Sequence, residues 1–325
     1  MKAVGLKKFG GAEVLEVLDL PEPKVGPKEI LIQVEAAGLN RADILVREGR
    51  YGAHRELPVV PGFEVAGKVK EVGPGVTKFK IGQKVIALLV IGGYAEQVVV
   101  PEGLALCIPD NLSMAEAAGI PDVFLTAWIT LFKKANLREG EKVLIHAAGS
   151  GIGMASIQLA KIFGATVFTT ASSDEKLEKA KTMGADFIIN YTKANFAEEI
   201  RKITAGQGVK VILDGVGAST LEGNLQALAE FGRLILIGTV GGREAQLHLG
   251  RAITKNVTLF AFRLHGHSNE LLACFLREFG QEILPLFAQG KLRSMVDRTF
   301  SFKEAKEAHS YLEQRKNFGK VILVP

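Results

Sequence analysis

The sequence predicts a protein of the α/β class with two parts, a β-rich domain and a doubly wound parallel sheet. In the first third of the 325-residue chain, short apolar segments alternate with glycine and proline turns, which indicates a small barrel or sandwich of strands. From residue 141 onward, apolar strand-like segments alternate with helical ones, a pattern typical of parallel βαβ units with right-handed crossovers. A chain of this length accommodates two separate hydrophobic cores.

The first part is expected to consist mainly of short strands. They are predicted over residues 30–37, 67–72, 84–88 and 94–100, where apolar and polar residues partly alternate. Ser113 and Glu116 have the spacing of a capping box, so a short helix should begin there. A longer apolar helix is predicted over residues 121–135.

The second part is expected to alternate strands and helices. Strands are predicted over 142–147, 165–170, 187–190, 209–214 and 234–237, and helices over 153–163 and 173–183. After about residue 265 the pattern becomes helical. It ends in strand-like segments at 297–302 and 320–324, which are expected to return to the first part.

Composition excludes several classes of protein. With 47% hydrophobic and 23% charged residues, the chain has the balance of a folded globular protein rather than a disordered one. The net charge is +5, and no run of five basic residues marks a nucleic-acid site. The two cysteines, Cys107 and Cys274, form no CxxC pair. No signal peptide or membrane-spanning stretch is found, so a cytoplasmic location and no membrane contact are expected.

The strongest local motif is a glycine-rich turn between a predicted strand and a predicted helix. The apolar strand ending at Ala147 leads into small residues that let a backbone approach a pyrophosphate, and the helix start supplies free N–H groups. The glycines do not have the strict GxGxxG spacing, and a tight turn without a ligand is the alternative. We predict dinucleotide binding by Ala148, Gly149, Ser150, Gly151, Ile152 and Gly153.

The end of the next predicted strand favours NADPH over NADH. An NAD site has an acid there to bind the ribose 2′-hydroxyl. Here Ser172 and Ser173 offer hydroxyl groups, and Lys176 offers a cation for a 2′-phosphate. Ser172 also has the spacing of a capping box with Glu175, which is compatible with this role. Asp174 leaves NAD as the alternative cofactor, because this acid would favour NAD if it bound the ribose 2′-hydroxyl.

Several segments together resemble one family. They are Gly38–Asp43 (GLNRAD), Arg47–Tyr51 (REGRY), Pro61–Gly67 (PGFEVAG), Leu125–Ala127 (LTA), the loop around Gly151 and Asn317–Leu323 (NFGKVIL). Over essentially its whole length, the chain resembles the zinc-free quinone oxidoreductases of the medium-chain dehydrogenase/reductase superfamily, the zeta-crystallin-like group. Many members of the group have a glycine at the position of Ser150. In having serine there, the chain is most similar to the stress-inducible quinone oxidoreductase branch.

The resemblance implies a domain organisation and a partner. A GroES-like substrate domain would comprise residues 1–121 and 266–325, and a Rossmann domain would comprise residues 122–265. Members of the group usually form homodimers, in which edge strands of two Rossmann sheets pair. Residues 256–262 are the expected pairing strand, since an apolar edge strand left open invites association.

The sequence predicts that no metal is bound. The zinc-dependent relatives carry a cysteine near Asn40, a histidine at the position of Phe63 and a four-cysteine lobe, and this sequence has none of these. Glu64 alone is not a zinc site, and the six histidines show no HExxH spacing.

The resemblance implies NADPH-dependent transfer of a hydride to small quinones, plausibly ortho-quinones, or to conjugated carbonyls. Asn40 and Tyr51 are the candidate catalytic residues at the substrate end. The alternative for Asn40 is an amide that stabilises a turn, and the alternative for Tyr51 is a loop aromatic packed on the domain edge. Asn40 could also contact the cofactor. The resemblance implies further contacts with the cofactor by Thr126, Tyr191, Gly238, Thr239, Arg315 and Asn317. The alternatives are that these side chains pack locally or carry solvated charges. His146 is expected to be structural.

Two other functions remain open at this stage. An NADPH-dependent enoyl or alkenal C=C reductase would share the fold and cofactor and differ only in its acceptor. A nucleotide-dependent RNA-binding protein, as attributed to some zeta-crystallin-like members, is disfavoured by the even spread of charge.

Overall fold

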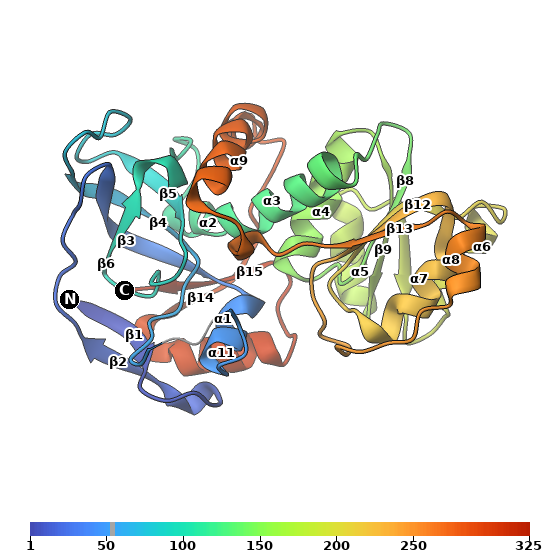
Figure 1. The fold of residues 1–325 in the computed structure, drawn as a ribbon, viewed down its shortest axis with the longest axis horizontal. Coiled ribbons are helices and arrows are strands. Elements are labelled where there is room, and N and C mark those ends of the chain that lie inside the picture. Colours follow the sequence, from blue (N-terminus) through green and yellow to red (C-terminus); the bar gives the residue numbers. More distant parts are fainter. Residues whose placement is uncertain (53–55) are drawn as a thin grey trace. The chain divides into compact units, whose positions relative to one another are not determined.

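The computed structural model describes residues 1–52 and 56–325. The chain forms two compact units (Figure 1): Met1–Leu125 with His265–Pro325, and Thr126–Leu264. The first unit is therefore built from two distant segments of the sequence. The limits expected from the sequence, 1–121 with 266–325 and 122–265, lie within a few residues of this division. The chain first passes from one unit to the other within a helix, α3 (Pro121–Trp128).

The first unit contains a seven-stranded sheet in the order β14-β15-β3-β4-β5-β7, with β6 paired to β3. Its strands are β3 (Glu29–Leu39), β4 (Glu64–Val72), β5 (Lys84–Leu88), β6 (Gln97–Pro101), β7 (Ala105–Cys107), β14 (Val296–Ser301) and β15 (Lys320–Val324). A separate antiparallel pair, β1 (Lys2–Leu6) and β2 (Leu15–Asp19), was not predicted. The expected return of the last strand is confirmed, because β15 pairs antiparallel with β3.

The helices of the first unit are α1 (Arg41–Arg47), α2 (Met114–Ala118), α9 (Asn269–Glu282), α10 (Leu284–Ala288) and α11 (Ala305–Glu313). The predicted capping box at the start of α2 is confirmed. The Glu116 N–H donates to Ser113 Oγ over 3.3 Å, and the Ser113 N–H donates to the Glu116 carboxylate over 2.9 Å. These bonds satisfy N–H groups that have no acceptor within the helix.

The second unit contains a six-stranded parallel sheet in the order β10-β9-β8-β11-β12-β13. Its strands are β8 (Lys142–Ile145), β9 (Thr166–Ala171), β10 (Phe187–Asn190), β11 (Val209–Asp214), β12 (Leu228–Leu236) and β13 (Thr258–Ala261). The helices flanking the sheet (Figure 1) are α4 (Gly151–Ile162), α5 (Asp174–Thr182), α6 (Phe196–Ile203), α7 (Leu221–Ala227) and α8 (Leu249–Thr254). This confirms the doubly wound Rossmann architecture. The strand order reverses between β8 and β11, and ligands of such sheets bind at the carboxyl ends beside that point.

Two local predictions differ from the structure. The helix expected over 121–135 is α-helical only through Trp128, and Ile129–Lys134 form a π-helical turn in which Thr130 Oγ1 donates to the carbonyl of Thr126 over 2.7 Å. The predicted capping box of Ser172 with Glu175 is wrong by one residue. Since β9 continues through Ala171, Ser172 makes the turn, and Ser173 Oγ accepts the Lys176 N–H over 3.3 Å.

In the described part of the chain, no helix is both long and apolar enough to cross a lipid bilayer.

A buried histidine of the first unit should make the protein sensitive to acid. His309 on α11 lies beside Arg47 of α1, with 3.4 Å between Nδ1 and the guanidinium. Burial, and then the charge of Arg47, lower the pKa of His309 to about 3. His309 is therefore neutral in the folded state at pH values where the unfolded chain takes up a proton. The contribution of neutral His309 to the free energy of unfolding is fully present above the unfolded pKa of about 6.5. It is lost as the pH falls toward 3, at about 1.4 kcal/mol per pH unit.

We expect His309→Gln to reduce this loss, because a glutamine oxygen can still accept from Arg47 but takes up no proton. Urea unfolding of both proteins at pH 7, 6, 5 and 4 measures the difference in slope. His248→Gln, at the exposed start of α8, is the control and should keep the slope of the parent protein. Equal slopes for the His309 variant and the parent would contradict the assignment.

Candidate functional site

The loop between β8 and α4 has the geometry of an anion-binding turn. Ala147 adopts a left-handed conformation with φ of 58°, and the Ala148 N–H donates to the carbonyl of Thr170 at the end of β9. Ser150 is the N-cap of α4, and its Oγ accepts the Gly153 N–H over 2.9 Å. Gly151 and Ile152 also lie in the first turn, so their N–H groups have no acceptor within the helix. These two groups, at the positive end of the helix dipole, fit a phosphate.

Gly153 allows the helix to begin this close to the strand. A Cβ atom placed on Gly153 would lie 2.3 Å from the carbonyl oxygen of Ala147. Real Cβ atoms do not approach a backbone oxygen so closely, so any side chain here would displace the loop. The structure thus gives a physical reason for the third of the three glycines in the loop.

The end of β9 brings several of the predicted cofactor residues together. Ser172 is exposed in the turn, and Ser173 and Lys176 are half-buried at the start of α5. Asp174 faces a different neighbour, because its carboxylate accepts from Asn190 Nδ2 over 2.7 Å and from Lys193 Nζ. The hydrogen bond from Lys193, and then that from Asn190, lower the pKa of Asp174. The acid that would mark an NAD site is already bonded within the second unit.

Two further predicted sets lie at the same edge of the sheet. The Tyr191 N–H, just after β10, donates to the carbonyl of Ala171 over 3.2 Å, so Tyr191 lies beside the end of β9. Gly238 and Thr239 follow β12, where Gly238 packs so closely on Gly215 that a Cβ would lie 2.7 Å from the Gly215 carbonyl oxygen. The carboxyl ends of β8, β9, β10 and β12 thus carry most of the predicted cofactor residues.

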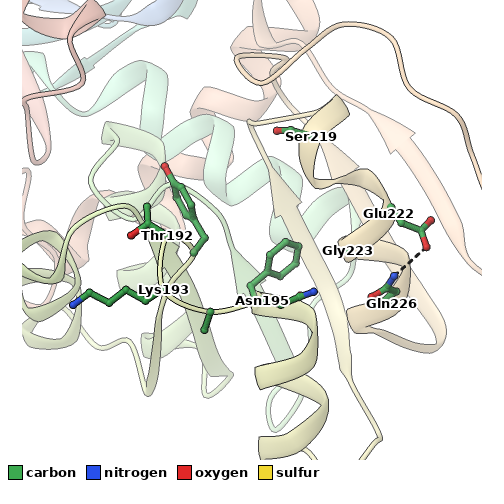
Figure 2. Close-up of a pocket in the computed structure, with 10 residues that line it drawn as sticks. Thr192, Lys193, Asn195, Ser219, Glu222, Gly223 and Gln226 are labelled. Carbon is green, nitrogen blue, oxygen red and sulfur yellow. Dashed lines mark hydrogen bonds between the residues drawn. The ribbon is translucent and has the colours of Figure 1, made fainter.

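An open cavity of about 530 Å³ lies in the second unit between the β10–α6 connection and α7. Figure 2 shows Thr192, Lys193 and Asn195 on one side, and on the other Ser219, in the 3-10 turn before α7, with Glu222, Gly223 and Gln226 on α7. Gln226 Nε2 donates to Glu222 Oε1 over 3.1 Å at its rim. Of the predicted cofactor residues, only Tyr191 lines this cavity.

In the first unit, a buried charged cluster surrounds Asn40. The Lys320 ammonium donates to Glu64 Oε1 and Asn40 Oδ1 over 2.6 Å each, and to the carbonyl of Leu39 over 3.1 Å. Asn40 Nδ2 in turn donates to Glu64 Oε1 over 2.8 Å. The side chains of Lys320 and Glu64 are 1% and 0% exposed. Asn40 is thus part of a fixed network within the unit, which accounts for its side-chain orientation whether or not it touches a ligand.

The same cluster extends to a carboxylate on α3. The Asp122 N–H donates to Glu64 Oε2 over 2.7 Å, and Asp122 Oδ2 lies 2.9 Å from His265 Nε2. Burial raises the pKa of Glu64 although Lys320 acts to lower it. Burial would also raise the pKa of Asp122, but the hydrogen bond and charge of His265 hold it below its usual value. Asp122 is therefore an ionised partner for His265.

An aromatic stack connects His265 to the predicted substrate residue Tyr51. The rings of His265 and Phe63 are stacked with centroids 4.2 Å apart, and Tyr51 meets Phe63 edge to face at 5.5 Å. Phe63 is fully buried and directly precedes Glu64. Within the first unit, Tyr51 thus contacts Phe63, and Asn40 is bonded to the adjacent residue, Glu64. Sequence reasoning missed Lys320, Asp122 and His265, since each gains its partners only through the fold.

The remaining predicted residues are more scattered. Thr126 is buried on α3, at the start of the second unit. Asn317 is buried in the first unit, where its Nδ2 donates to the Gly319 carbonyl over 2.8 Å, and Arg315 is exposed nearby. Their contact with a cofactor stays a prediction. His146 lies between Thr170 and Asn224, with 2.8 Å to each, and burial lowers its pKa, which fits the structural role expected for it.

Comparison with known families gives two matches. Residues 26–110 match the alcohol dehydrogenase GroES-like domain, and residues 151–279 match the zinc-binding dehydrogenase family. The second description names zinc. Within residues 1–52 and 56–325, however, no three His, Cys, Asp or Glu side chains are grouped so that they could hold a metal ion.

Curated relatives align along the whole chain. The synaptic vesicle membrane protein VAT-1 homolog of Rattus norvegicus is 31% identical, covering 100% of this chain and 84% of the relative. The quinone oxidoreductase of Pseudomonas aeruginosa is 33% identical over 325 residues, covering 100% of this chain and 99% of the relative.

Solved structures share the complete fold. A crystal structure described as an NAD-dependent alcohol dehydrogenase has a TM-score of 0.91 at 37% identity, and both chains are covered fully. The Escherichia coli quinone oxidoreductase complexed with NADPH also has a TM-score of 0.91, at 30% identity with full coverage of both chains. A GroES-like unit joined to a Rossmann unit with a glycine-rich loop defines a nucleotide-dependent oxidoreductase. The chain belongs to the medium-chain dehydrogenase/reductase superfamily, with quinone oxidoreductases among its relatives.

Proposed function

We propose that this protein is an NADPH-dependent reductase of small quinones and related conjugated carbonyls. The observation that carries the choice of cofactor is the end of β9. There Ser173 and Lys176 offer a hydroxyl and a cation, whereas the two acids between them are bonded elsewhere, Asp174 to Asn190 and Lys193 and Glu175 to Lys179. The E. coli relative complexed with NADPH supports this choice, and the NAD-dependent relative makes NADH the necessary comparison.

The residues of the second unit fit the dinucleotide. Gly151 and Ile152 would donate their N–H groups to the pyrophosphate, and Lys176 with Ser172 and Ser173 would hold the 2′-phosphate. Tyr191 lies beside the end of β9 and would cover the adenosine end. When bound, NADPH supplies a hydride from the nicotinamide C4 atom.

The first unit would bind the acceptor. A quinone is a strong electrophile, so hydrogen bonds suffice to polarise its oxygen. Asn40 is held by Glu64 and Lys320 in one orientation, and Tyr51 lies against Phe63. We assign both residues to orienting the acceptor. Such fixed placement of the reacting groups contributes much of the rate enhancement in hydride transfer.

The direct test is NADPH oxidation by EDTA-treated protein, followed at the nicotinamide absorbance. The acceptors are ortho-quinones, para-quinones and alkenals, with NADH measured in parallel. We expect turnover with quinones that is faster with NADPH than with NADH and is unaffected by EDTA. Faster turnover of alkenals than of every quinone would instead identify a C=C reductase. Tight NADPH binding without turnover of any acceptor would refute the proposal.

The 2′-phosphate assignment predicts a change in cofactor preference. Lys176→Ala should weaken NADPH binding and leave NADH binding nearly unchanged, because only NADPH carries the extra phosphate. Charge-assisted bonds of this kind contribute about 1.5–3 kcal/mol, or roughly 10- to 150-fold in the dissociation constant. Fluorescence titration with each cofactor measures both constants.

The matched control for Lys176→Ala is Lys179→Ala. Lys179 lies one turn further along α5 and pairs with Glu175 over 2.7 Å. Its removal should leave both dissociation constants unchanged. An equal loss of affinity for NADPH and NADH in Lys176→Ala would contradict the assignment.

We also propose a homodimer formed through β13. This strand is at the edge of the six-stranded sheet, and Leu259 on it and Leu249 and Ile253 on α8 are exposed, Ile253 by 74%. An open edge strand with apolar neighbours favours pairing with a second copy. Sedimentation analysis should show a dimer, and Leu259→Lys should shift it toward a monomer. A monomeric parent protein at micromolar concentration would refute this.

A further inference from the structure

The imidazole of His265 has one ring nitrogen in an ion pair and the other without a partner. Nε2 lies 2.9 Å from Asp122 Oδ2. Nδ1 is buried and meets no hydrogen-bonding atom in the described part of the chain, and the side chain as a whole is 6% exposed. A buried polar atom without a partner costs about 1–3 kcal/mol, so such atoms call for an explanation in a native structure.

The orientation of His265 is fixed from several sides. Its ring stacks on Phe63, and its Nε2 is directed to Asp122, whose own N–H is bonded to Glu64. The charged and titratable groups around it are Asp122 on α3, Glu64 on β4, Lys320 on β15 and the hydroxyl of Tyr51 beyond Phe63. The carboxylate of Asp122 favours an Nε2–H tautomer, so a second proton on the ring would be carried by Nδ1.

We propose that His265, oriented by Asp122, donates a proton from Nδ1 to the oxygen of the acceptor during its reduction. The proposal rests on the function proposed above and names its proton donor. Addition of a hydride to the conjugated acceptor breaks a π bond and leaves negative charge on the acceptor oxygen. The Nδ1–H bond then breaks as an O–H bond forms, so the imidazolium becomes a neutral imidazole that keeps its Nε2–H bond to Asp122. Solvent returns the proton to His265 in the next cycle.

The strength of this effect should depend on the acceptor. A quinone is electrophilic enough to accept a hydride with little help, whereas an enone gains its reactivity from a proton or hydrogen bond on its oxygen. Loss of His265 should therefore slow enone reduction more than quinone reduction. If His265 served only to connect α3 with the segment at residue 265, its loss would slow the reduction of both acceptors equally.

The kinetic test compares His265→Gln with the parent protein from pH 5.5 to 9. Glutamine can still donate to Asp122 but carries no titratable proton. We expect kcat to fall about 100-fold or more with an enone and at most about 10-fold with 1,4-benzoquinone. Any dependence of kcat on pH that the parent shows with the enone should be absent in the variant. The dissociation constant for NADPH should stay within about twofold.

Two other variants make the test specific. His267→Gln, which changes the neighbouring histidine that packs on Phe275, should leave the rates unchanged. Tyr51→Phe removes the phenol hydroxyl of Tyr51, which is the alternative proton donor beside the stack. If Tyr51→Phe abolishes the pH dependence and His265→Gln retains it, or if His265→Gln lowers both rates equally, the proposal is overturned.

A second measurement does not depend on turnover or on a folded variant. In nuclear magnetic resonance spectra of the parent protein, the ring nitrogens of His265 should shift when hydroquinone, the reduced product of benzoquinone, is added without oxygen. Unchanged His265 signals in the presence of bound hydroquinone would overturn the proposal. If the parent protein reduces no acceptor but hydroquinone shifts His265, the proposed function fails while the binding contact stands.

Discussion

Lys320→Met should destabilise the protein by about 3–5 kcal/mol, because it leaves a buried carboxylate without its cation. Lys320 donates to Glu64, Asn40 and the Leu39 carbonyl in a setting that excludes water. Methionine fills a similar volume and makes none of these bonds. Guanidinium unfolding at pH 7 measures the loss. A change below 1 kcal/mol would show that the ion pair is not formed in solution.

The pH dependence of this variant provides an internal check. Burial already raises the pKa of Glu64, and removal of Lys320 should raise it further. A carboxyl group whose folded pKa lies above its unfolded value stabilises the fold in its protonated form. Its contribution is present below the unfolded pKa and is lost as the pH rises through the folded pKa. Lys320→Met should therefore be less stable at pH 8 than at pH 6, and adding Glu64→Gln should recover part of the loss and remove this dependence.

Gly153→Ala should lower the affinity for NADPH by roughly 10- to 150-fold, since a lost hydrogen bond to a charged group costs about 1.5–3 kcal/mol. The added Cβ would lie 2.3 Å from the Ala147 carbonyl oxygen, and the backbone of the loop must shift to admit it. The shift moves the N–H groups of Gly151 and Ile152 away from the phosphate. Calorimetric titration with NADPH measures the affinity.

Gly250→Ala is the matched control for that substitution. Gly250 lies in α8, where the nearest atom to an added Cβ is 3.5 Å away, an ordinary contact. This variant should bind NADPH as the parent protein does, with a slightly higher stability from the better helix propensity of alanine. Unchanged NADPH affinity in Gly153→Ala would mean that the loop does not hold the pyrophosphate.

Local sequence patterns were enough to predict the nucleotide-binding part of the fold. The strand, glycine turn and helix around Gly151 are contiguous, and each shows its own periodicity. The errors concern boundaries that depend on neighbours. Ser172 and Ser173 are equally good caps, and the length of β9 decides between them. An apolar segment such as Ile129–Lys134 does not reveal whether its turns are α- or π-helical.

The charged cluster of the first unit could be predicted only in part. Asn40 and Tyr51 came from a resemblance, and the return of β15 to the first domain was expected. Nothing local indicates that Lys320 meets Glu64, 256 residues away, because a lysine at the start of a strand usually points to solvent. His265 pairs with Asp122 across 143 residues, and a single histidine without ligand spacing carries no signal for that contact.

The position of β15 also has a consequence for the order in which the protein is made. In the sheet β15 pairs with β3, but in the sequence the entire second unit is translated between them. Lys320 follows Leu39 by 281 residues, a delay of roughly 15–60 s at ribosomal rates of about 5–20 residues per second. During that time residues 37–39 of β3 lack their partner strand β15 and Glu64 has no cation, whereas the strands of the second unit emerge one after another and can pair at once. The second unit is thus free to fold on the ribosome before the first unit is complete, and this end of β3 is where a chaperone would have most to protect.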